Sequence, residues 1–192
     1  MPPLSPVVCC LDTVTNGEDR AVCPLSALLQ EDARSEGRWL QILFFKSDSD
    51  MFEKILVVCV GNICRSPTGE RLLRERLPGC QVSSAGVSAL VDKPADKVAS
   101  EVAQLHGLSL DGHSARQLTR ALCQDADLIL VMEKGHISAV TAIDPGARGK
   151  TMLFGHWQGE SEVPDPYRLS REAYEHVYQL LVRGADGWAK KL

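Results

Sequence analysis

The sequence lacks a long apolar run. None of its 192 residues lies in a stretch like the roughly 18 consecutive apolar residues that a membrane-spanning helix needs. The first residues also lack the basic start and long apolar core of a secretory signal peptide. With 44% hydrophobic and 24% charged residues, the chain can bury an adequate core of its own. We therefore expect a cytoplasmic protein that does not insert into a membrane.

Basic clusters and paired metal-binding motifs are also missing. The net charge is −4, and no patch of lysine or arginine indicates a nucleic-acid partner. The seven cysteines, an odd number without the spacing of a disulfide framework, favour reduced thiols. Four residues separate Cys59 from Cys64, whereas zinc and thioredoxin-like motifs place two residues between paired cysteines. We expect no metal and no other cofactor.

Residues 1–50 differ in composition from the rest of the chain. They contain four prolines and three cysteines, show no sustained helical or alternating pattern, and carry the whole net charge of −4. We hypothesise that Met51 is the native start and that residues 1–50 are a non-native extension. A disordered regulatory leader is the alternative. Residues 51–192 are expected to form the single folded domain.

From Met51 onward, short apolar runs alternate with helical patterns, which is typical of a chain that builds a parallel sheet. The predicted strands are 54–60, 81–84, 128–132 and 151–154, and the predicted helices are 67–77, 95–106, 119–124, 133–142 and 170–190. Right-handed crossovers would place helices on both faces of the sheet. The sequence thus predicts an α/β fold with an open four-stranded parallel sheet.

The chemistry is concentrated between the first predicted strand and the first predicted helix, in the stretch Cys59-Val60-Gly61-Asn62-Ile63-Cys64-Arg65-Ser66-Pro67. A loop at a helix N-terminus directs backbone N–H groups and the positive end of the helix dipole at one point, which makes a phosphate-binding loop. The same field stabilises a thiolate at Cys59. Arg65 adds a planar fork that can grip two phosphoryl oxygens. This pattern indicates a cysteine-dependent phosphatase.

Other glycine-containing loops disagree with these residues. A nucleotide-binding P-loop ends in Gly-Lys-Ser or Gly-Lys-Thr, and the dinucleotide fingerprint has three spaced glycines. The present loop has one glycine and no lysine. The purely structural alternative is that Cys59 and Cys64 are two buried cysteines of a strand and a turn, without a chemical role.

Further motifs extend the pattern along the chain. With residues 58–67, the chain resembles the low-molecular-weight protein tyrosine phosphatases through Ser84-Ala85-Gly86, His113 with Ala115-Arg116-Gln117, Asp127 to Glu133, and Asp165-Pro166-Tyr167. The resemblance runs from about Met51 to the C-terminus. Within that family, residues 155–157 and 164–168 are most similar to the bacterial branch encoded with exopolysaccharide and capsule genes. This branch implies a phosphotyrosine protein as partner, namely an autophosphorylating tyrosine kinase of the inner membrane.

The resemblance implies three catalytic residues. Cys59 would attack phosphorus and leave a phosphocysteine, while Arg65 would hold the phosphoryl oxygens. Asp165 would protonate the tyrosyl oxygen, since the family carries its general acid in a matching Asp-Pro-Tyr. Pro164 and Pro166 forbid a helix around Asp165, which suits a rigid loop that holds one carboxylate over a pocket. An ordinary Asp-Pro turn is the competing interpretation.

The other expected site residues support these three. The cradle for the phosphoryl group consists of Val60, Gly61, Asn62, Ile63 and Cys64. Ser66 resembles the hydroxyl that hydrogen-bonds the nucleophile, although it also suits the first turn of a helix. Tyr167 is expected to form a wall against which a phosphotyrosine ring stacks, with core packing as the competing use.

A supporting network is expected behind the cradle. Asn62 suits a left-handed backbone position, which asparagine tolerates better than most residues. The family pairs this asparagine with a serine and a histidine, which Ser84 and His113 match. Cys64 could trap an oxidised Cys59 as a disulfide, or it could simply be a small buried side chain.

Two rival functions stay open. Arsenate reductases of the same fold use a nearly identical loop and pass oxidation to further cysteines, but Cys80 and Cys123 form no close pair in this sequence. A catalytically idle phosphoprotein-binding module would be expected to lack Cys59, Arg65 or Asp165.

Overall fold

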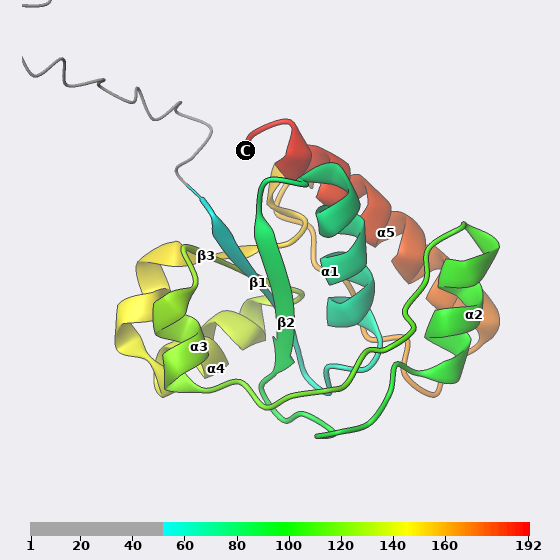
Figure 1. Cartoon of the computed structure of the whole chain (residues 1–192), viewed down its shortest axis with the longest axis horizontal. Helices are drawn as coiled ribbons and strands as arrows, with labels where there is room; N and C mark the ends of the chain where they lie inside the picture. Colours follow the sequence, from blue (N-terminus) through cyan, green and yellow to red (C-terminus); the bar gives the residue numbers. More distant parts are fainter. Residues whose placement is uncertain (1–51) are drawn as a thin grey trace, which may run out of the picture. The chain divides into compact units, whose positions relative to one another are not determined.

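The computed structural model describes residues 52–192 (Figure 1). The extension predicted over residues 1–50 lies outside this range. One sheet contains the strands β1 (Lys54–Cys59), β2 (Gln81–Gly86), β3 (Leu128–Val131) and β4 (Thr151–Leu153). The strand order is β2-β1-β3-β4, and all three neighbouring pairs are parallel. The predicted open four-stranded parallel sheet is confirmed.

The helices are α1 (Arg65–Arg76), α2 (Lys97–Leu105), α3 (Arg120–Asp125), α4 (Lys134–Ile143) and α5 (Arg171–Ala189). Each lies within two residues of its predicted bounds. Two short 3₁₀ helices, η2 (Pro145–Lys150) and η3 (His156–Gln158), were not predicted because such short turns have no apolar period to detect. Within residues 52–192, none of the helices combines the length and apolarity that crossing a bilayer requires.

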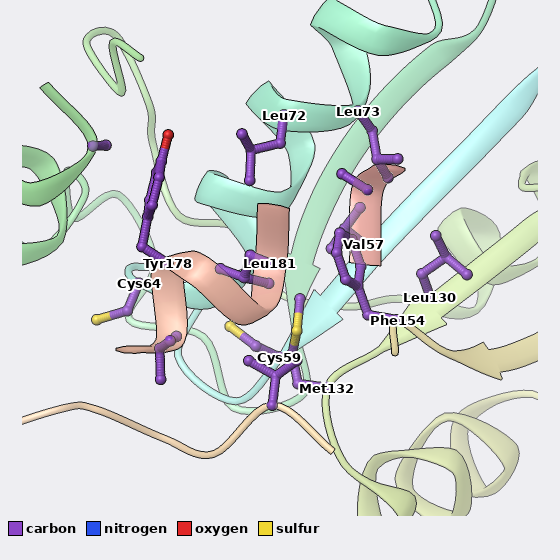
Figure 2. Packing of buried hydrophobic residues seen from close by; sticks show 14 of the residues in the cluster. Val57, Cys59, Cys64, Leu72, Leu73, Leu130, Met132, Phe154, Tyr178 and Leu181 are labelled. Carbon is purple, nitrogen blue, oxygen red and sulfur yellow. The ribbon is translucent and has the colours of Figure 1, made fainter. Parts of the chain in front are cut away.

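The two faces of the sheet carry separate halves of the core. Along β1, Ile55, Val57 and Cys59 belong to the cluster on the side of α1, α2 and α5, while Leu56 and Val58 belong to the cluster on the side of α3 and α4 (Figure 1). A strand that is buried on both faces reads as a continuous apolar run, which is the pattern that predicted it. In the first cluster, shown in part in Figure 2, Cys59 ends the apolar row of β1.

The sequence predicted that Pro67 would be the first residue of helix α1. The helix instead begins at Arg65, so Pro67 is its third residue. The shift is tolerated because the N–H groups of the first turn have no partner inside a helix. No acidic side chain lies in this turn, and the positive end of the helix dipole is therefore directed uncompensated at the preceding loop. That loop leaves the carboxyl end of β1, where open parallel sheets bind their ligands.

Candidate active site

A main-chain cradle connects β1 to α1. Three of its carbonyl groups accept hydrogen bonds from the segment 88–96: Val60 O from the Ser88 amide, Gly61 O from Leu90 and Ile63 O from Asp96, at 2.8 to 3.1 Å. A trans peptide points its N–H away from its C=O, so the amides that follow these carbonyls point to the inner side of the loop. The Asn62 amide shows this directly, because it donates to Cys59 Sγ at 3.3 Å.

Gly86, the last residue of β2, allows the backbone of the cradle to lie close against the backbone of β2. A Cβ atom at this position would lie 2.4 Å from Val60 O and 3.0 Å from Asn62 N. Any other residue would therefore push the cradle away from the sheet. Gly86 lies within the motif Ser84-Ala85-Gly86, but the sequence pattern predicted no role for it. The available signal was a glycine inside a strand pattern, which often marks a site where another backbone comes close.

A chain of hydrogen bonds leads from the thiol into the interior. Ser66 Oγ lies 2.9 Å from Cys59 Sγ and accepts a hydrogen bond from Asn62 Nδ2 at 2.9 Å. Asn62 Nδ2 also donates to Ser84 Oγ at 2.9 Å, and Ser84 donates to the buried Glu70 carboxylate at 2.5 Å. The Ser66 hydroxyl accepts from Asn62 and still has a hydrogen of its own that it can donate to the sulfur. This is the arrangement that a thiolate requires.

Asn62 anchors the cradle at its centre. It is fully buried and its φ is +56°, the left-handed region expected for it. Its carbonyl lies 2.7 Å from His113 Nε2, and its Oδ1 accepts the Arg116 amide at 2.9 Å. Every polar atom of the side chain thus has a partner, as buried polar groups require. The structure brings Ser84 and His113 to the same asparagine from two distant parts of the chain.

Arg65 joins the nucleophile loop to the rest of the site. The side chain is almost fully buried, with 2% of the residue exposed. Its NH1 donates to Val163 O at 2.9 Å and pairs with Glu133 Oε1, and its NH2 pairs with Asp165 Oδ2 at 2.9 Å. A buried guanidinium needs such partners because an unpaired buried charge is strongly unfavourable.

Glu133 is a site residue to which sequence reasoning assigned no role. It immediately precedes α4 and lies two residues after β3. The carboxyl ends of neighbouring parallel strands meet at one edge of the sheet. A carboxylate just beyond β3 is therefore well placed to meet a cation that follows β1. That position was the signal available in the sequence.

Asp165 lies on the open side of the site. Its Oδ1 accepts the Tyr167 amide at 3.2 Å, and 46% of its side chain is exposed. A pocket gathers eight of the predicted residues: Cys59, Val60, Gly61, Ile63, Cys64, Arg65, Asp165 and Tyr167. Asn62 and Ser66 do not line it and are fully buried. Ser88 and Leu90, which were not predicted, complete the lining.

The second thiol of the loop differs from the first in its surroundings. Burial raises the pKa of the Cys64 thiol well above its ordinary value, and the Asp96 carboxylate adds to this shift. Cys64 is therefore a neutral thiol at physiological pH, and its proposed capture of an oxidised Cys59 stays a prediction. Across residues 52–192, no three His, Cys, Asp or Glu side chains gather closely enough to hold a metal ion.

A thiol at the carboxyl end of a parallel strand, a main-chain cradle and a buried arginine together indicate a cysteine-dependent phosphatase. The family model described as "Low molecular weight phosphotyrosine protein phosphatase" matches residues 54–192. The chain belongs to this family of protein-tyrosine phosphatases, as the resemblance in its motifs predicted.

Individual relatives agree with the family model. The chain is 60% identical over 141 residues to the low molecular weight protein-tyrosine-phosphatase Etp of Escherichia coli K12, covering 73% of this chain and 95% of Etp. It is also 60% identical over 142 residues to Wzb of Salmonella typhimurium, covering 74% and 95%. The structure of Vibrio vulnificus Wzb in complex with benzylphosphonate is 59% identical, with a TM-score of 0.72 over 73% of this chain and 99% of that one.

Proposed function

We propose that Cys59, Arg65 and Asp165 hydrolyse phosphotyrosine on a protein through a phosphocysteine intermediate. The observation that carries this assignment is the convergence of three groups from two distant segments, because Cys59 ends β1 and Arg65 begins α1, whereas Asp165 lies much further along the chain, between η3 and α5. Cys59 Sγ lies 2.9 Å from a hydroxyl that is free to donate to it, and Arg65 lies 2.9 Å from the Asp165 carboxylate in the same pocket. That the proposed nucleophile, phosphate clamp and proton donor line one pocket supports the proposal.

The reaction has two steps. In the first, Cys59 Sγ attacks phosphorus in line, the bond from phosphorus to the tyrosyl oxygen breaks, and Asp165 transfers its proton to that oxygen. In the second, water attacks the phosphocysteine, Asp165 takes a proton from the water, and the S–P bond breaks to release phosphate. The inward-pointing amides and Arg65 hold the phosphoryl oxygens through both transition states.

Substrate binding rearranges the partners of Arg65. In the structure, Asp165 Oδ2 pairs with the Arg65 guanidinium. A phosphoryl group offers two oxygens to the same fork in a bidentate contact. Its arrival therefore frees the exposed Asp165 carboxyl to turn toward the leaving oxygen, while Glu133 and Val163 keep their contacts with NH1.

The bench test compares phosphotyrosyl and phosphoseryl peptides of the same sequence, each with and without EDTA. We expect release of phosphate from the phosphotyrosyl peptide alone, at the same rate in both buffers. A requirement for added metal would contradict the mechanism. Arsenate-dependent consumption of thioredoxin would favour an arsenate reductase, and failure to release phosphate from para-nitrophenyl phosphate would favour an idle binding module.

In the cell, the proposed substrate is an autophosphorylated tyrosine kinase of the inner membrane that controls exopolysaccharide or capsule production, and the proposed location is the cytoplasm. The support is the sequence similarity to one bacterial branch of the family and to relatives named Etp and Wzb. Incubating the purified chain with the phosphorylated kinase tests this proposal by anti-phosphotyrosine blot. A kinase that keeps its phosphotyrosine, while free peptides are hydrolysed, would contradict the partner and leave the chemistry intact.

A further inference from the structure

Exposed apolar side chains gather at the mouth of the pocket. Among residues 52–192, seven large hydrophobic side chains are exposed: Val60, Leu90, Val91, Leu105, Trp157, Tyr167 and Leu169. Val60, Leu90 and Tyr167, which are 37%, 44% and 39% exposed, line the pocket that contains Cys59. We call these three residues the apolar rim. Apolar surface grouped at a functional site marks an interaction surface, whereas scattered exposed residues need no explanation.

The main chain of the rim is held in place before any ligand binds. The Leu90 amide donates to Gly61 O at 3.0 Å, and the Leu90 carbonyl accepts the Lys93 amide at 3.0 Å. The Tyr167 amide donates to Asp165 Oδ1 at 3.2 Å. A surface already ordered in this way loses little conformational freedom when a ligand covers it. The rim is therefore suited to add affinity rather than only to enclose the pocket.

The charges of the lining do not favour an acidic ligand beyond the phosphoryl group. The lining contains one cation and one carboxylate, Arg65 and Asp165, and these two pair with each other. Close to the rim along the chain, Arg168 lies over the Tyr167 ring at 5.1 Å, and Asp92 and Lys93 are exposed with opposite charges. What a substrate meets outside the cradle is mainly apolar.

We propose that the apolar rim selects phosphotyrosyl segments with an aliphatic or aromatic residue two positions from the phosphotyrosine. This inference rests on the proposed function, because it places a phosphotyrosine in the cradle. In an extended segment, successive side chains point to opposite faces, so the residues two positions before and after the phosphotyrosine lie on its own face, about 6.8 Å along the chain on either side. They therefore meet the mouth of the pocket, where covering Leu90 or Val60 removes apolar surface from water.

The test uses three phosphotyrosyl peptides that differ only in the two flanking residues on the same face as the phosphotyrosine, two positions before and two positions after it, which are leucine, alanine or glutamate. We expect the leucine-flanked peptide to have a kcat/KM about fivefold to tenfold higher than the alanine-flanked peptide, the size expected for partial burial of an aliphatic side chain. The readout is the ratio of two substrates measured on one enzyme preparation, so a fraction of unfolded enzyme cancels out.

Matched variants test whether the preference for leucine-flanked peptides depends on Leu90. Leu90→Ser should bring the ratio of leucine-flanked to alanine-flanked kcat/KM close to 1, and Leu90→Met should keep it. Leu105→Ser is the control, because Leu105 is also exposed, at 70%, but ends α2 and does not line the pocket. It should leave the ratio of the native chain unchanged.

The outcomes separate the rim from the chemistry. Hydrolysis of all three peptides at equal kcat/KM, or a preference for the glutamate-flanked peptide, would overturn the proposed rim and leave the phosphatase assignment standing. An unchanged ratio in Leu90→Ser would also overturn it. No hydrolysis of any phosphotyrosyl peptide would overturn both the rim and the proposed function.

Discussion

The two sides of the pocket are built in different ways. On the nucleophile side, Cys59, Asn62, Arg65 and Ser66 are all buried and hydrogen-bonded within the interior. On the acid side, close to half of the Asp165 side chain faces solvent. Its local shape comes from a short turn and two flanking prolines. Arg65 is the direct link between the two sides.

This difference in burial suggests different roles for the two sides of the pocket in the proposed reaction. A buried nucleophile loop is preorganised, so the amides and Arg65 need not reorganise when charge develops on the phosphoryl group. In the proposed mechanism, the exposed Asp165 must instead approach the leaving oxygen and exchange a proton with water. Changes on the nucleophile side should therefore affect both stability and activity, whereas changes on the acid side should affect activity alone.

The largest effect is expected for Cys59→Ser. Loss of the sulfur nucleophile should lower kcat toward para-nitrophenyl phosphate by about 10⁴-fold or more. Binding of inorganic phosphate, measured by calorimetry, should persist because the amides and Arg65 remain. Cys80→Ser is the control, since that thiol donates a hydrogen bond to Phe52 O at 3.2 Å and does not line the pocket. Turnover that survives Cys59→Ser would remove the sulfur from the mechanism.

The next largest effect tests the acid side. Asp165→Asn should lower kcat by roughly 10²- to 10⁴-fold for phenyl phosphate, and by much less for aryl phosphates with good leaving groups. Equal slowing across leaving groups would exclude Asp165 as the acid. The free energy of unfolding in urea should change by no more than about 0.5 kcal/mol, because the Asp165 side chain is half exposed and the Arg65 guanidinium keeps its contacts with Glu133 and Val163 O. A large loss of stability would break the proposed contrast between the two sides.

Glu133→Gln tests the connection through Arg65. The substitution keeps the shape but removes the charge paired with the buried guanidinium. We expect kcat/KM to fall about tenfold, equivalent to roughly 1.4 kcal/mol of transition-state stabilisation. Glu162→Gln is a matched control, because Glu162 Oε1 accepts the Lys134 amide at 2.6 Å and is not among the partners of Arg65. If both variants lose the same activity, general charge loss explains the effect.

The smallest effect isolates the backbone of the cradle. Asn62→Ala and Asn62→Gly lose the same side-chain hydrogen bonds, but only glycine adopts a φ of +56° without strain. We expect Asn62→Gly to be more stable than Asn62→Ala by about 1 kcal/mol in urea unfolding. Equal stabilities would mean that the left-handed turn carries no strain that matters to folding.

Much of the fold and part of the site could be predicted from local patterns. These patterns are the unbroken apolar run of β1, the alternation of strands with helices, and the loop residues 59–67. Each pattern consists of residues that are close in the chain, so it can be recognised without knowing the tertiary contacts. They were sufficient for the parallel sheet and the cradle. The start of α1 was placed two residues too late, because the N–H groups of a first turn impose no requirement that a sequence pattern could reveal.

By itself, the sequence determined the sheet, the helices and the chemical identity of the cradle, because these depend on neighbouring residues. Only the tertiary structure decided three further contacts. Glu133 pairs with the Arg65 guanidinium, Gly86 leaves room for the backbone of the cradle, and Leu90 lines the pocket. These residues follow or end other strands, and they meet the cradle only when β1, β2 and β3 lie side by side. The physical reason is that packing between residues far apart in the chain decides which strands are neighbours in the sheet. The strand order in turn decides which loops meet at the carboxyl-terminal edge of the sheet.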